Sequence, residues 1–95
     1  MIFAFTFMTL DTKYDSSHCI SEIQKISHVK EVHELYGIYD VLAIVEVEST
    51  SQLKELTFKT VRRLEFVKST ITLIAFESYK NDLLSKNRSP YVVSS

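Results

Sequence analysis

The residues of this chain best suited to binding chemistry form the segment Gly37-Ile38-Tyr39-Asp40, which contains the only glycine of the sequence. Glycine adopts backbone conformations that other residues avoid, so Gly37 can reverse the chain between two strands. Asp40 then places a carboxylate directly after the turn. A carboxylate there can accept hydrogen bonds from nearby backbone N–H groups. From the residues alone, we predict a hairpin and favour a turn-capping role for Asp40.

The other residues with catalytic or metal-binding chemistry form no recognisable set. His18 and Cys19 are neighbours that point in different directions on a helix, and no third group is spaced to hold a base against the thiol. His28 and His33 lack metal-ligand spacing. A single glycine cannot supply a phosphate-binding loop or a dinucleotide fingerprint. We therefore expect no catalytic residue, no metal and no cofactor.

The composition excludes several classes of protein. A chain of 95 residues with 45% hydrophobic content predicts one globular domain. Its 11 basic and 12 acidic side chains leave a net charge of −1, which gives no footprint for direct nucleic-acid binding. No apolar run is long enough to span a membrane. The single cysteine, Cys19, cannot form an internal disulfide, which fits a cytoplasmic location.

Two β-α-β patterns follow each other along the chain, separated by Gly37. One helix is predicted to begin near Asp15 or Ser16 and the other near Ser49 or Thr50, residues that favour helix starts. The expected strands cover residues 2–10, 29–36, 39–48 and 66–77. This order predicts an α+β, ferredoxin-like βαββαβ fold, a four-stranded antiparallel sheet with both helices on one face. The expected boundaries are 1–77 for the domain and 78–95 for a C-terminal tail.

Both faces of the predicted sheet are apolar at its centre. In the first strand Phe5 and Phe7 point to one side, while Ala4 and Met8 point to the other. Two helices cover only one face, and a bare second face would exceed the apolar patch of a typical soluble monomer. We expect a second copy to cover it, giving a dimeric α/β-barrel type of assembly. The alternative is that the tail folds back. Phe58, outside the inward helical stripe, is either a second contact surface or an ordinary exposed aromatic residue.

Residues 29–74 resemble the effector-binding (RAM) domain of the Lrp/AsnC family of transcription regulators, and the similarity in pattern extends over residues 1–76. The family pattern is a strand, then glycine, any residue, Tyr or Phe, Asp, an apolar strand, a helix, and a Ser-Thr-x-Thr segment in the last strand. The matching residues here are Gly37, Tyr39, Asp40, Val67 and Ser69-Thr70-Ile71-Thr72. The family usually has glycines in the turns before its second and last strands. This chain has Ser27-His28 and Glu65-Phe66 instead.

The resemblance implies that the hairpin contributes to a pocket for a free amino acid between neighbouring dimers. Asp40 would accept hydrogen bonds from the ammonium group of the amino acid. Backbone N–H groups near Gly37 and the hydroxyls of Thr70 and Thr72 would bind its carboxylate. The implied ligand-binding residues are Gly37, Ile38, Tyr39, Asp40, Thr70 and Thr72. The capping role of Asp40 remains an equal alternative.

The predicted function is a non-enzymatic effector-binding and oligomerisation module. We expect a homodimer, dimers that join into a ring, and co-assembly with full-length Lrp/AsnC regulators. No helix-turn-helix precedes the first strand, so the chain resembles the stand-alone members and is not expected to bind DNA directly. One alternative is a small dimeric α/β-barrel enzyme of the cofactor-free oxygenase or heme-handling type. Another is a structural partner without a ligand.

Overall fold

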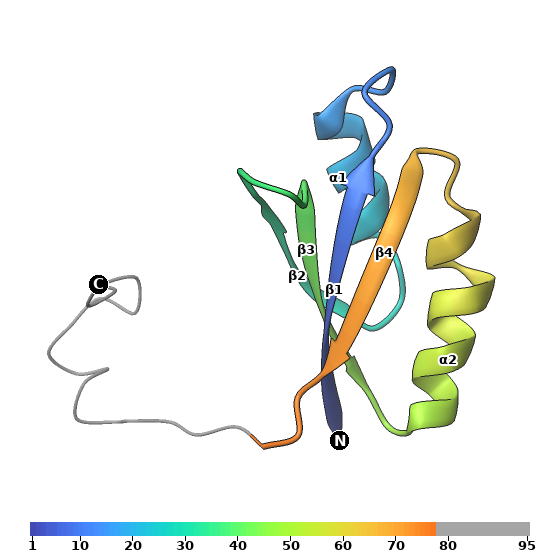
Figure 1. The fold of residues 1–95 in the computed structure, drawn as a ribbon. Coiled ribbons are helices and arrows are strands. Elements are labelled where there is room, and N and C mark those ends of the chain that lie inside the picture. Colours follow the sequence, from blue (N-terminus) through green and yellow to red (C-terminus); the bar gives the residue numbers. More distant parts are fainter. Residues whose placement is uncertain (78–95) are drawn as a thin grey trace, which may run out of the picture.

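The computed structural model describes residues 1–77, which form an antiparallel sheet of four strands with two α-helices on one face (Figure 1). In chain order the elements are β1 (Ile2–Leu10), α1 (Ser16–Gln24), β2 (Val29–Glu34), β3 (Val41–Val47), α2 (Thr50–Lys59), the short 3₁₀ helix η1 (Val61–Arg63) and β4 (Val67–Ile74). The strand order is β2-β3-β1-β4. The predicted βαββαβ topology is confirmed. The predicted tail, 78–95, lies outside the described residues.

The core lies between the sheet and the helices, in two adjacent clusters. α1 buries Cys19 and Ile23 against one part of the sheet, and α2 buries Leu53 and Leu56 against the other. These side chains recur at helical spacing, so each helix presents one apolar stripe to the strands. The sheet residues beneath them are Ala4, Met8, Val41, Ala43, Val45 and Val47. They alternate along β1 and β3, which places every second side chain under a helix.

The helix starts agree with the predicted positions, but the two caps differ. Ser49 is the N-cap of α2, and its Oγ accepts a hydrogen bond from the backbone N–H of Gln52 (3.1 Å). The Gln52 side chain in turn accepts from the N–H of Glu48 (2.7 Å), which resembles a capping box. Asp15 occupies the N-cap of α1 without a side-chain cap bond. The last three strands are shorter than predicted: β2 ends at Glu34, β3 spans Val41–Val47 and β4 spans Val67–Ile74.

The turn before β2 contains a non-glycine residue with left-handed backbone geometry. His28 has φ +75°, in the region that favours glycine. The backbone there is fixed by two bonds, from Val29 N–H to the Ile26 carbonyl (3.2 Å) and from Glu46 N–H to the His28 carbonyl (3.0 Å). A side chain in this region of φ is strained, because its Cβ crowds the backbone. The chain keeps the turn at the cost of that strain.

Replacing His28 with glycine is therefore expected to stabilise the protein by about 0.5–1 kcal/mol, the relief of the left-handed strain less the extra entropy of an unfolded glycine. Gly37→Ala is the matched opposite change, because Gly37 has φ +145° and no atom lies near its missing Cβ. It should destabilise by a similar amount through backbone strain alone. Urea unfolding of both variants measures the difference. A loss of stability in His28→Gly would instead show that the contact between His28 and Gln52 stabilises the fold.

The sheet face away from the helices is apolar at its centre and is called the outer face here. In the antiparallel pairing Phe5 lies opposite both Ile44 and Leu73, so these three side chains share that face. Leu73 is 54% exposed and Phe3 is 38% exposed. The large apolar side chains of the outer face are Phe3, Phe5, Phe7, Leu42, Ile44, Ile71 and Leu73, and Glu46 lies on the same face opposite Phe3. The contacting pair Glu31 and His33 (3.1 Å) lies beside it on β2.

Candidate functional site

The hairpin between β2 and β3 is tied down at both of its ends. The backbone N–H of Leu35 donates to the Asp40 carbonyl (2.8 Å), which closes the turn around Gly37. The Asp40 N–H donates to the Met8 carbonyl (2.9 Å), which attaches the same turn to β1. Between these anchors the turn residues are open to solvent, and Ile38 is an exposed large hydrophobic residue. The predicted turn at Gly37 is thus present, at the end of the sheet, and is anchored to the central strand β1.

One oxygen of the Asp40 carboxylate accepts a hydrogen bond within the chain, and the other does not. Its Oδ2 accepts a hydrogen bond from the backbone N–H of Leu10 (2.7 Å), 30 residues earlier in the chain. The predicted turn-capping bond to a nearby N–H is therefore replaced by a bond whose donor lies on β1. Oδ1 has no hydrogen-bond partner among the described residues. None of the side-chain oxygens of these residues is both buried and unpaired, so an unpaired Oδ1 is not buried. Oδ1 is thus accessible and can accept a further hydrogen bond.

A groove of 320 Å³ lies beside Asp40, between the turn and the start of α1. Four carboxylate side chains line it, and its lining includes no lysine, arginine or histidine. Ser16, the first residue of α1, also lies in the lining. We call this the acidic groove; its carboxylates are Asp11, Asp15, Glu34 and Asp40. Such a lining attracts a cation or an ammonium group and repels an anion.

Sequence reasoning did not place three of these four carboxylates in a site. Asp11 and Asp15 stand on either side of the loop between β1 and α1, and Glu34 ends β2. They meet only because β1 lies beside β3, which brings the α1 entry next to the β2–β3 turn (Figure 1). The one local signal of an acidic site was the pair of acidic residues between a strand and a helix. From the sequence alone, Asp15 is interpreted as a helix cap instead. Their convergence depends on the topology.

The structure does not bring Thr70 and Thr72 to the hairpin of the same chain. Both threonines lie on the helix side of β4, where Thr72 Oγ1 lies 3.3 Å from the hydroxyl of buried Thr6. β1 separates them from β3, since Met8 pairs with Thr70 on one side and with Val41 on the other. Tyr39 lies on the opposite side of the sheet, with its ring 5.4 Å from that of Phe7. One chain alone therefore does not assemble the full predicted set.

Both threonines line a second groove, of 580 Å³, between α2, η1 and β4. Its other lining residues include two cations and a further threonine. We call this the α2–β4 groove; it is lined by Thr57, Arg62, Val67, Lys68, Ser69, Thr70 and Thr72. The two grooves thus differ in the sign of their charge.

Cys19 and His18 are used for packing. Cys19 is fully buried in the core, and burial, followed by the nearby charge of Asp15, raises the pKa of its thiol. A thiol with a raised pKa stays protonated at neutral pH and is a poor nucleophile. The ring of neighbouring His18 packs edge-on against Phe66, with ring centres 6.4 Å apart. Within residues 1–77 no cluster of His, Cys, Asp or Glu is arranged to hold a metal ion.

The family profile described as the Lrp/AsnC ligand binding domain matches residues 4–84. The chain belongs to this family. The Lrp/AsnC assignment made from the Gly37–Asp40 turn and the Ser69–Thr72 segment is therefore confirmed, and the fold expected of the family is the one observed.

Solved structures show the same domain alone and within longer proteins. The protein TTHA0845 from Thermus thermophilus is 28% identical, with a TM-score of 0.78, over 85% of this chain and 100% of that one. Escherichia coli AsnC shares the fold at 19% identity and a TM-score of 0.75, over 81% of this chain but 52% of its own. A Neisseria meningitidis transcriptional regulator, NMB0573, solved as a complex with L-Met, is 15% identical with a TM-score of 0.74, over 84% of this chain and 53% of its own.

No curated protein matches this Lrp/AsnC domain in sequence. None of the helices formed by residues 1–77 has the length and apolar character required to cross a bilayer.

Proposed function

We propose that this Lrp/AsnC domain is a non-enzymatic, cytoplasmic module that binds a free amino acid and modulates transcription through its assembly. The observation that carries the proposal is the family match over residues 4–84, which includes the hairpin and the last strand. A neighbour with the same fold, the Neisseria meningitidis regulator, forms a complex with L-Met. The chemistry of the acidic groove supports an amine-bearing ligand, because its carboxylates can accept hydrogen bonds from an ammonium group.

In this proposal Asp40 is the principal acceptor for the ammonium group. Its Oδ1 is accessible, while Leu10 holds Oδ2 and so fixes the orientation of the carboxylate. A side chain that is already immobilised loses little entropy when a ligand binds. Gly37, Ile38 and Tyr39 form the adjoining turn, where backbone N–H groups can reach the ligand.

The carboxylate of the amino acid requires donors that the acidic groove does not supply from its side chains. Thr70 and Thr72 were predicted to provide them, and within one chain they lie on the far side of β1 from Asp40. We therefore place the complete site between copies, with the Asp40 turn of one copy and the threonines of another. Separating the acceptor and donor groups in this way would make ligand binding depend on assembly.

The outer face supports the proposed homodimer. It presents contiguous apolar side chains from three strands, including Phe5, Leu42 and Leu73, with polar residues beside it on β2. An apolar centre with a polar rim is the arrangement found at protein interfaces. A second copy related by a two-fold axis would bury the same face on both chains. Dimers joined into a ring, and mixed assemblies with full-length Lrp/AsnC regulators, are the further partners we propose.

A thermal-shift screen of the standard amino acids tests the ligand. A ligand at a hundred times its Kd stabilises the folded state by about 2.7 kcal/mol, and each kcal/mol raises Tm by about 4–8 °C for a domain of this size. We expect one amino acid, or a small related group, to raise Tm by several degrees. The N-acetylated form of the same amino acid lacks the ammonium charge and should give no shift. Equal shifts with both forms would contradict binding through Asp40.

A further inference from the structure

The α2–β4 groove exists because α2 does not cover the edge strand beside it. The buried residues of α2, Leu53 and Leu56, pack against Ala4 of β1 and Val45 and Val47 of β3. The helix-facing side of β4 therefore lines a groove beyond the core. β4 runs beside α2 (Figure 1). This part of the strand is polar where a covered strand would be apolar, and its side chains there are Lys68, Thr70 and Thr72.

The charge in this groove is uncompensated. Arg62 and Lys68 both line it, while none of its lining residues is acidic. Neither cation takes part in any of the ion pairs formed within residues 1–77. The hydroxyls of Thr57 and Thr70 add neutral donors to the same space. Two cations and several hydroxyls around one concavity are complementary to an oxyanion.

The guanidinium of Arg62 is held in place by a neighbouring aromatic ring. It lies over the face of Phe58, 5.1 Å from the ring centre, in a cation–π contact. Phe58 is 56% exposed, so this contact also explains an aromatic side chain that points away from the core. An arginine whose plane is already fixed loses less conformational freedom when it binds a carboxylate or a phosphate.

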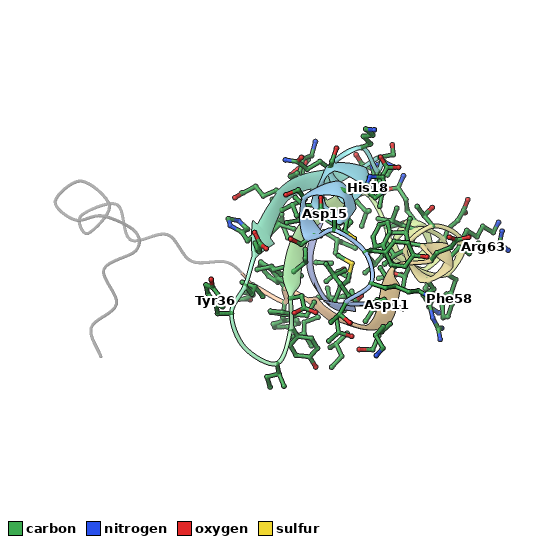
Figure 2. The ribbon with its side chains drawn as sticks, turned by 90° about the horizontal axis from the view of Figure 1, so that it is seen from above. Asp11, Asp15, His18, Tyr36, Phe58 and Arg63 are labelled. Atoms are coloured by element: carbon green, nitrogen blue, oxygen red, sulfur yellow. The ribbon has the colours of Figure 1, made fainter. Side chains whose placement is uncertain are left out.

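We propose that the α2–β4 groove binds the oxyanion of a small organic molecule, a phosphate or a carboxylate group, through Arg62, Lys68 and the threonine hydroxyls. Its volume of 580 Å³ lies in the range of small-molecule sites and exceeds what a bare anion occupies. The site lies apart from the acidic groove, but it shares Thr70 and Thr72 with the carboxylate site under Proposed function, and to that extent it rests on that proposal. Figure 2 shows Phe58 and Arg63, beside this groove, on the opposite side of the molecule from Tyr36 in the hairpin turn.

The test is an NMR titration of the full 95-residue chain with inorganic phosphate and, separately, with acetate, each against sodium chloride at matched ionic strength. We expect saturable shifts of the backbone amides of residues 68–72 with at least one oxyanion and none with chloride. Tighter binding of phosphate would assign a phosphorylated ligand, and tighter binding of acetate would assign a carboxylate. Shifts that are absent, or equal to those with chloride, would overturn the proposal.

Substitutions separate a defined site from general charge attraction. Arg62→Gln should weaken anion binding roughly tenfold, the effect of losing a charge-assisted hydrogen bond. Arg63→Gln removes the same charge from the adjacent position, which does not line the groove, and should change affinity less than about twofold. Equal losses in both variants would contradict the site. Asp40→Asn should leave anion binding unchanged, so a failure of the amino-acid proposal remains distinguishable from a failure of this one.

Discussion

Phe5→Asp is expected to convert the assembled protein into folded monomers, whereas Val45→Asp is expected to unfold the chain. The two positions lie near the centre of the same sheet but on opposite faces. Val45 is 2% exposed and packs under the helices with Leu53 and Leu56. Phe5 lies on the outer face, opposite Ile44 and Leu73, and is only half-buried in one chain.

The difference in outcome follows from what surrounds the new carboxylate. At Val45 it would be buried without a partner, which costs several kcal/mol, and a domain of this size has only about 5–15 kcal/mol of stability. At Phe5 the carboxylate stays hydrated in the monomer and is desolvated only when the second copy docks. The folded monomer should therefore survive, and the dimer should lose affinity by several orders of magnitude.

Light scattering and circular dichroism together distinguish these results. We expect the wild type to scatter as at least twice 11.0 kDa at micromolar concentration, and Phe5→Asp as 11.0 kDa with an unchanged spectrum. Phe58→Asp makes the same chemical change on α2 and should keep the wild-type mass. A smaller mass for Phe58→Asp would identify α2 as a second contact surface. A wild type that is a stable monomer would contradict the proposed homodimer.

Most of the fold could be predicted because it depends on local periodicity. Alternation in β1 and β3 separates Val45 from Ile44, and helical spacing places Leu53 and Leu56 on one stripe, so the element order follows. The turns were less accessible to prediction. His28 has the φ of a glycine without being one, because the bonds from Val29 N–H to the Ile26 carbonyl and from Glu46 N–H to the His28 carbonyl hold the turn in place of sequence preference. Tertiary contacts of this kind leave no local pattern.

The candidate site was predictable only in part, because its residues come together through strand pairing. Asp40 was recognisable from its place after Gly37, but its predicted turn-capping bond is replaced by a bond to Leu10 on β1. The donor, Leu10, could not be foreseen, since it depends on which strand lies beside β3. Thr70 and Thr72 share a face because they are two residues apart. Their sequence spacing does not show that β1 separates them from Asp40.

Asp40→Asn should weaken amino-acid binding while leaving the fold and the assembly intact. Asparagine keeps an oxygen that can accept the hydrogen bond from Leu10 N–H and removes only the negative charge. A hydrogen bond to a charged group contributes about 1.5–3 kcal/mol, so affinity should fall roughly ten- to a hundredfold. The hairpin lies at the end of the sheet, away from Phe5, and the mass should not change. Calorimetry with the amino acid found in the thermal screen measures the loss.

Two matched variants separate the roles of this carboxylate. Asp40→Ala removes both the charge and the bond to Leu10 N–H, and should lower stability by about a further 1–2 kcal/mol, the cost of one orphaned backbone donor. Asp11→Asn removes a charge from the same acidic groove, but Asp11 already lies 4.0 Å from the ammonium of Lys13. If Asp40 contacts the ligand directly, Asp11→Asn should cost far less affinity than Asp40→Asn. Equal losses of affinity in the two variants would mean that the ligand is attracted by the combined charge of the acidic groove. An unfolded Asp40→Asn would show that the carboxylate is needed for folding.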